Sequence, residues 1–130
     1  LQTATLIDKE YEHITVDMPL TALFEHIKKG KKNIIAVLNS NGILEGILNM
    51  DDLRPILFGS TTEAAVTIRS LMKAPTTIVS LNDKVPEIIK IFDQTGLWHL
   101  PVVNEDKQFV GFLGKEAILS NYRMLLKAYS

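Results

Sequence analysis

The 130-residue sequence contains no cysteine. Disulfide bridges and thiolate zinc sites are therefore excluded, and a scaffold without them is typical of a reducing compartment. Glycine and proline are also few, at 7 and 5 residues, and 46% of the residues are hydrophobic. This composition indicates a compact, folded chain. At this length the chain can bury a core without disulfides or metals.

An excess of charge of either sign is also missing. Lys and Arg number 14 against 15 Asp and Glu, for a formal charge of −1. No overall field therefore recruits nucleic acid or an anionic membrane, and partners must be recognised locally. The basic cluster KKGKK, residues 28–32, has no interleaved aromatic residue, which favours a solvated helix end over a nucleic-acid site.

Long apolar runs are absent as well. Charged residues or asparagine interrupt every segment before it reaches the roughly 20 residues of a transmembrane helix. The N-terminal stretch LQTATLIDKEYEH contains acidic residues, unlike a secretory signal peptide. Because the sequence begins in the middle of a pattern, we expect a soluble fragment of a longer protein that does not itself insert into a bilayer.

The sequence repeats itself internally. Residues 34–50 (IIAVLNSNGILEGILNM) align with residues 99–115 (HLPVVNEDKQFVGFLGK) at an offset of 65, which places Gly46 on Gly111. An internal repeat of this kind indicates two copies of one structural unit.

The alignment continues upstream of the two hairpins. Residues 20–27 and 85–92 each carry apolar residues at the i, i+3, i+4, i+7 spacing of one helix face. Before that helix, ITV (14–16) matches TIV (77–79) only after a shift of two residues, which predicts a loop insertion in one copy.

Each copy therefore predicts a strand, a helix, a hairpin and a second helix, the last beginning near Met50 or Lys115. TTEAAVTIRSLMK, residues 61–73, predicts a helix with threonine at its start that joins the copies. Neither half, at about 60 residues, would be comfortably stable alone. We expect an α+β fold of two pseudo-symmetric β-α-β-β-α repeats packed through their sheets. The expected organisation is an N-terminal segment with repeat 1 over 1–58, a connecting helix over 59–74, and repeat 2 with a C-terminal helix over 75–130.

This arrangement resembles the CBS domain pair, or Bateman module. The signatures are LPVVN (100–104) and a glycine-hydrophobic-hydrophobic-Thr/Ser-x-x-Asp stretch after each hairpin. The first copy reads GILNMDD (46–52), with Asn49 in place of Thr/Ser. The second copy has Gly114 and Ala117 at the hydroxyl and aspartate positions, so we expect the stronger ligand site in the first copy. Ala36 also stands where the family usually has the strand proline.

Three phrases are similar, more narrowly, to the cytoplasmic C-terminal region of prokaryotic ClC-type chloride channels and transporters. They are KKNIIAVLNSNGILEGILNMDDLRPILF, TGLWHLPVV and GFLGKEAILSNYRMLL, and the resemblance spans about residues 15–126. It implies a non-enzymatic regulatory module on the cytoplasmic side of the membrane. The implied partners are a second copy, in a homodimer, and the transmembrane chloride-transport domain of the same polypeptide. The alternatives are a ligand-free dimerisation or assembly module and a CBS pair from a magnesium transporter, a kinase regulator or an enzyme of nucleotide metabolism.

The resemblance also implies a regulatory nucleotide site for AMP, ADP or ATP, with no cofactor required. The terminal aspartate, here Asp52, would accept hydrogen bonds from the ribose hydroxyls, and Asn49 would help to hold phosphate. Chemically, a carboxylate offers two acceptors to a vicinal diol, and the amides at a helix start favour phosphate. The plainer interpretation is that Asp51 and Asp52 stabilise the first turn of a helix.

Several further residues are candidates for this site. An adenine could stack on the indole of Trp98, beside His99, but the plainer interpretation is that Trp98 caps the core. Asn33 could hydrogen-bond a base edge or its own backbone. The remaining candidates, which the resemblance implies, are the strand residues Thr15, Ile35 and Ile78.

Catalysis is not predicted. Adjacent helical residues point about 100° apart, so Asp51 and Asp52 cannot readily share one metal ion. The three histidines, His13, His26 and His99, have no metal-ligand spacing. The sequence also shows no nucleophile paired with a base, which favours a binding module over an enzyme.

Overall fold

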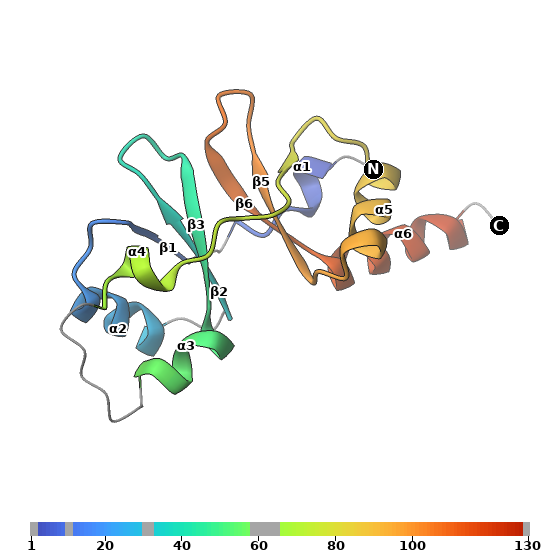
Figure 1. The fold of residues 1–130 in the computed structure, drawn as a ribbon. Coiled ribbons are helices and arrows are strands. Elements are labelled where there is room, and N and C mark those ends of the chain that lie inside the picture. The colour runs from blue at the N-terminus through green and yellow to red at the C-terminus, as the bar shows by residue number, and fades with distance from the viewer. Residues whose placement is uncertain (1–2, 10–11, 30–32, 58–65, 129–130) are drawn as a thin grey trace. The chain divides into compact units, whose positions relative to one another are not determined.

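A computed structural model describes residues 3–9, 12–29, 33–57 and 66–128 (Figure 1). The chain divides into two compact units. The first unit comprises residues 11–76, and the second unit comprises residues 1–10 together with 77–130. The N-terminal segment therefore belongs to the same unit as the C-terminal half of the chain.

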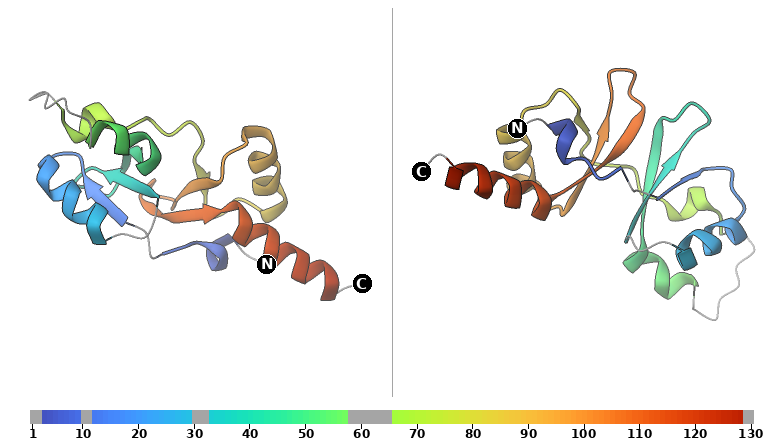
Figure 2. Two further views of the ribbon diagram at one scale, coloured as in Figure 1. Left: turned by 90° about the horizontal axis from the view of Figure 1, so that it is seen from below. Right: turned by 180° about the vertical axis from the view of Figure 1, so that it is seen from behind.

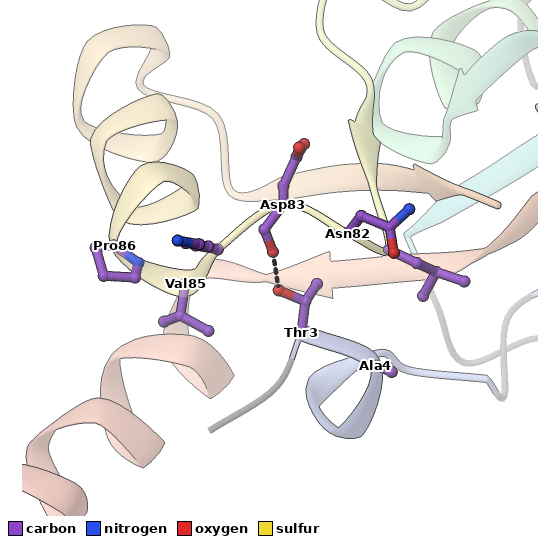
Figure 3. Close-up of a pocket in the computed structure, with 8 residues that line it drawn as sticks. Thr3, Ala4, Asn82, Asp83, Val85 and Pro86 are labelled. Carbon is purple, nitrogen blue, oxygen red and sulfur yellow. Dashed lines mark hydrogen bonds between the residues drawn. The ribbon is translucent and has the colours of Figure 1, made fainter. Parts of the chain in front are cut away.

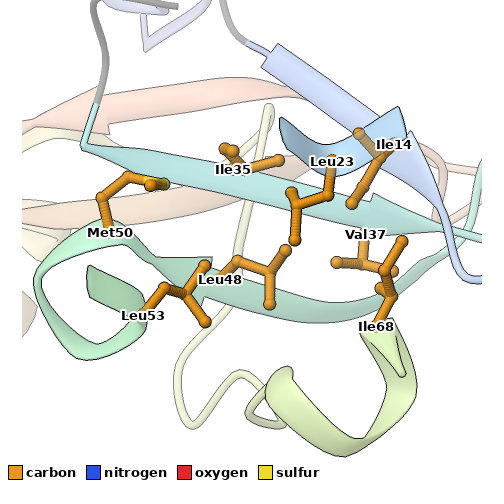
Figure 4. Close-up of a cluster of buried hydrophobic side chains, with 8 residues drawn as sticks. All are labelled: Ile14, Leu23, Ile35, Val37, Leu48, Met50, Leu53 and Ile68. Carbon is orange, nitrogen blue, oxygen red and sulfur yellow. The ribbon is translucent and has the colours of Figure 1, made fainter. Parts of the chain in front are cut away.

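The first unit contains one three-stranded sheet in the order β1-β2-β3. Strand β2 pairs in parallel with β1 and antiparallel with β3. The elements along the chain are β1 (Glu12–Thr15), α2 (Leu20–Lys29), β2 (Ile34–Leu38), β3 (Leu44–Asn49), α3 (Met50–Leu57) and α4 (Ile68–Leu71). Figure 4 shows the buried cluster, which draws on every one of these elements: Ile14, Leu23, Ile35, Val37, Leu48, Met50, Leu53 and Ile68.

The second unit repeats this plan with the sheet order β4-β5-β6. Its elements are α1 (Thr3–Leu6), β4 (Val79–Ser80), α5 (Val85–Thr95), β5 (His99–Val103), β6 (Phe109–Gly114) and α6 (Lys115–Ala128). Helices α5 and α6 contact each other (Figure 2). The buried cluster comprises Val79, Val85, Ile88, Phe92, Leu100, Val102, Leu113 and Ile118. Among the described helices, none has the length and apolar character needed to cross a membrane.

Helix α5 illustrates how the sequence sets these elements. Its buried residues Val85, Ile88 and Phe92 follow the helical period, so one stripe enters the core. Pro86 lies in the first turn, where its missing N–H is not needed. Gly96 ends the helix with a φ of 70°, a left-handed conformation that glycine adopts without strain.

The two units match residue for residue at the offset of 65, and no insertion separates them. Ile14 lies opposite Val37 in one sheet, and Val79 lies opposite Val102 in the other. Ile14 and Val79 are each 1% exposed and hold the same core position. The predicted shift of two residues is therefore wrong. The shift came from matching similar residue types in ITV and TIV. The alternation of buried and exposed residues along each strand instead decides which positions of the two copies are equivalent.

The repeat also extends to the N-terminal segment, which the sequence pattern did not predict. Helices α1 and α4 are equivalent at the same offset, and each is followed by one bridge to the third strand of its unit. Asp8 pairs with Phe112, and Lys73 pairs with Ile47. The available signal was the apolar pair Leu6-Ile7, which matches Leu71-Met72.

The helix predicted over 61–73 is much shorter in the part of it that the structure describes, residues 66–73. There it covers only Ile68–Leu71, because Thr67 and Ser70 form a capping box that fixes its start. Lys73 pairs with a strand instead of continuing the helix. Residues 61–65, and with them the predicted threonine cap, lie outside the described residues.

Candidate functional site

The candidate site begins where β3 passes directly into α3, as the sequence predicted for Met50. The backbone N–H of Met50 donates to the carbonyl of Asn33 at 2.9 Å, which fixes the corner between β2, β3 and α3. The side-chain Oδ1 of Asn49 accepts from the N–H of Asp51 at 3.2 Å. Asn49 therefore caps the helix, a role for which asparagine is as suitable as the serine or threonine it replaces.

The two acids in the first turn of α3 have different partners. Asp51 accepts from Arg54 within the helix at 3.4 Å. Asp52 accepts a hydrogen bond from the Lys73 ammonium at 3.1 Å, and the side chains of Asp52 and Lys73 are both more than half exposed. No group of three potential metal-ligating side chains occurs among the described residues. The arrangement is one carboxylate, Asp52, presented at a helix start with a lysine ammonium beside it.

The second unit has the same corner with different side chains. The N–H of Lys115 donates to the carbonyl of Trp98 at 2.9 Å, as Met50 donates to Asn33. The Lys115 ammonium lies 5.1 Å from the centre of the Trp98 ring, a cation–π contact. Gly114 has no capping side chain, and Ala117 has no carboxylate. A cavity of about 250 Å³ is lined by Trp98, His99, Gly114, Lys115 and Glu116.

Trp98 does not cap the core, so that alternative is wrong. The side chain is 61% exposed and lies in the loop between α5 and β5. His99 is exposed as well. Whether an adenine stacks on Trp98 stays a prediction.

Asn33, Asn49 and Asp52 are brought together at one corner of the first unit. Ile35 lies two residues after Asn33 on the central strand β2, and it is only 2% exposed because its side chain belongs to the core. Thr15 is not part of this corner. It pairs with Leu38, three residues farther along β2 than Ile35, which corresponds to about 10 Å along a strand.

Ile78 belongs to the second unit and is 45% exposed. The shift of two residues had made it the counterpart of Thr15. At the observed offset the counterpart of Thr15 is Ser80, which pairs with Val103 as Thr15 pairs with Leu38. Thr15 and Ile78 therefore do not hold equivalent positions in their two units.

A second, larger cavity of about 650 Å³ was not predicted. It lies in the second unit between α1 and the segment 81–86, where the hydroxyl of Thr3 donates to the carbonyl of Asp83 at 2.6 Å (Figure 3). In the first unit the counterparts of Thr3 and Asp83 are Ile68 and Met18, which pack against the core. The cavity follows β4, at the end of the sheet opposite to His99 and Gly114.

Known proteins match both units. The family model of the CBS domain matches residues 4–59 and again residues 68–123. No curated protein matches the chain in sequence.

Several solved structures have the same fold. The CBS domains of a transcriptional regulator from Streptococcus pneumoniae align with a TM-score of 0.75 at 16% identity, over 92% of this chain and 98% of the other. CBSX2 in complex with AMP aligns with a TM-score of 0.76 at 18% identity, over 99% and 98%. The cytosolic domain of the Mg²⁺ channel MgtE in complex with ATP aligns with a TM-score of 0.73 at 21% identity, over 92% of this chain and 48% of the other.

Proposed function

Since the chain belongs to the CBS domain family and contains two such domains in tandem, we propose that it is a regulatory module that binds an adenine nucleotide at the Asn33–Asn49–Asp52 corner of the first unit. The observation that carries this proposal is the Asp52 carboxylate, held in the first turn of α3 and still exposed. Two carboxylate oxygens match the two hydroxyls of a ribose. AMP and ATP in the matched structures of CBSX2 and MgtE support the choice of ligand.

The other groups at the corner suit the rest of such a ligand. Asn33 is exposed at the entry to β2 and can hydrogen-bond a base edge. The first turn of α3 supplies the positive end of a helix dipole for phosphate. The second unit, with Gly114 and Ala117 at its corner, offers the indole of Trp98 for stacking but no carboxylate at the position of Asp52, so we expect weaker binding there.

The experiment is a thermal melt of the chain with AMP, ADP, ATP and S-adenosylmethionine in turn. A ligand at 100 times its dissociation constant adds about 2.7 kcal/mol to the free energy of unfolding, which appears as a raised Tm. We expect a shift with at least one adenine nucleotide and its loss in Asp52→Ala. Asp51→Ala is the matched control: it removes the adjacent exposed acid, whose partner is Arg54, and should keep the shift.

A folded wild-type chain that responds to none of these ligands would contradict the proposal. It would favour the second candidate function, a ligand-free dimerisation or assembly module. The observations on that side are the altered motif of the second unit and the exposure of two large apolar side chains among the described residues, Ile78 and Trp98. Sedimentation over a range of concentrations, with and without nucleotide, separates the two functions.

For the parent protein we propose a ClC-type chloride channel or transporter, on the strength of the three similar phrases. The module would then act on the cytoplasmic side of the membrane, as a homodimer joined to the transmembrane domain. A nucleotide regulates such a protein only if it prefers one of two arrangements, typically by about 1–3 kcal/mol. Chloride flux by the whole parent protein in liposomes, with and without nucleotide, tests this; a parent with another activity, such as a magnesium transporter, would contradict it.

A further inference from the structure

Lys73 reaches the Asp52 carboxylate from a separate part of the first unit. Its ammonium lies 3.1 Å from Oδ2 of Asp52. Its backbone is fixed, because Lys73 and Ile47 exchange two hydrogen bonds of 2.9 Å each. The Lys73 side chain is 75% exposed, so other groups do not enclose its ammonium.

The second unit shows that the fold does not need this ion pair. Asp8 holds the position of Lys73 and exchanges the same two backbone hydrogen bonds with Phe112, at 2.9 and 3.4 Å. Ala117 holds the position of Asp52. An aspartate and an alanine cannot form an ion pair, yet the strands, the bridge and the following helix are all preserved. The Lys73–Asp52 pair is therefore a feature of the candidate site and not of the fold.

An exposed ion pair of this kind is weak and easily replaced. Ribose hydroxyls that donate to Asp52 would displace the ammonium from the carboxylate. The ammonium has three donors and no acceptor, and Lys73 carries it on a flexible stem whose backbone stays fixed. Once displaced, the ammonium of Lys73 would need a new anionic partner, and an anionic group on the same ligand could supply it.

We propose that Lys73 is a specificity-determining residue that makes the site select nucleotides, which carry a 5′-phosphate, over nucleosides, which do not. This inference rests on the proposed function, in which Asp52 binds the ribose. With AMP, the ammonium exchanges a carboxylate for a phosphate. With adenosine, it loses the carboxylate and gains nothing.

The two ligands should therefore respond differently to Lys73→Met, which keeps the length of the side chain and removes its charge. The affinity for AMP should fall about tenfold, as expected for the loss of one charge-assisted phosphate contact. The affinity for adenosine should stay within about twofold of the wild-type value or rise, because no ammonium competes for Asp52. Lys73→Arg should keep most of the preference for AMP.

The experiment is isothermal titration calorimetry of AMP and of adenosine against wild-type chain, Lys73→Met and Lys73→Arg. Arg69→Met is the matched control, since Arg69 is an exposed cation of α4 in the same segment and should leave both affinities unchanged. Raising the salt concentration should weaken the binding of AMP to the wild type more than to Lys73→Met. A thermal melt of each variant verifies that it is folded.

Each outcome decides the inference. A selective loss of AMP affinity in Lys73→Met supports it. An equal loss for AMP and adenosine, or no loss for either, overturns it while leaving the proposed nucleotide site in place. Binding of neither ligand to the wild-type chain overturns this inference, and the proposed function falls with it only if ADP, ATP and S-adenosylmethionine also leave the Tm unchanged.

Discussion

A Cβ atom at Gly111 would lie 2.6 Å from the carbonyl oxygen of Asp8, closer than real Cβ atoms approach. The bridge between Asp8 and Phe112 holds that oxygen in place, and Gly111 has a φ of 154°. Gly111→Ala must therefore move backbone, and we expect it to lower the free energy of unfolding by about 3 kcal/mol. Urea unfolding at equilibrium measures the change.

Gly46→Ala is the internal comparison for that prediction. A Cβ at Gly46 would meet the side chain of Met72, with its Sδ at 2.7 Å, and no backbone atom is among its nearest contacts. Because a methionine side chain can reorient, we expect a loss of only about 1 kcal/mol. A larger loss for Gly46→Ala than for Gly111→Ala would contradict this difference between a backbone neighbour at Gly111 and a side-chain neighbour at Gly46.

Lys107 is predicted to be a strained residue whose replacement stabilises the protein. It has a φ of 64°, and its counterpart in the other hairpin is Gly42, with a φ of 80°. Lys107→Gly removes the steric cost of the left-handed conformation, so we expect a gain of about 1 kcal/mol in the free energy of unfolding. The opposite kind of change in the other hairpin, Gly42→Ala, should lower the free energy of unfolding by a similar amount. A neutral result for both would mean that this turn relaxes freely.

The capping role of Asn49 predicts a separate effect on stability. Asn49→Ala leaves the N–H of Asp51 without its side-chain partner, and loss of such a cap costs about 1 kcal/mol. Gly114 is the counterpart in the second unit, and a Cβ there would meet only His99, at 4.0 Å. Gly114→Asn should therefore be accommodated and should stabilise the chain by a few tenths of a kcal/mol. Chemical unfolding of both variants tests the pair, and a destabilised Gly114→Asn would contradict the equivalence of the two corners.

Trp98 is the chain's one tryptophan and predicts a clear spectroscopic signal. Because its side chain is 61% exposed, its fluorescence should be strongly quenched by acrylamide in the folded protein. Trp98→Ala should change the free energy of unfolding by less than about 1 kcal/mol, since little apolar surface is lost from the core. Blue-shifted, poorly quenched emission would show that this face is covered in solution, as by a second copy of the chain.

The sequence predicted the parts of the fold that depend on local pattern. The hairpins, the apolar stripes of α2 and α5 and the start of α3 at Met50 follow from period and turn chemistry, and they are confirmed. The register of β1 was not predicted, because a strand of four residues carries too little pattern to fix its pairing partner. Pairing of the N-terminal segment with β6 joins residues about a hundred positions apart, a distance at which local pattern has no influence.

The candidate site was predicted with similar limits. Asn33, Asn49 and Asp52 belong to two segments that a hairpin must bring together, and they do lie at one corner. Thr15 was a candidate through the resemblance alone, and its distance from the corner depends on its pairing with Leu38, which the sequence did not predict. Lys73 was missed altogether, because its approach to Asp52 depends on the bridge to Ile47, and a single bridge leaves no pattern in a sequence.

The division of the chain has a consequence for its biosynthesis. The first unit is continuous over residues 11–76, whereas the second unit needs residues 1–10 in addition to 77–130. Because a chain leaves the ribosome from its N-terminus, the first unit can be complete while most of its companion is still untranslated. Residues 1–10 must then wait for β6, which is made about a hundred residues later, and we expect α1 to dock only after the first unit is complete.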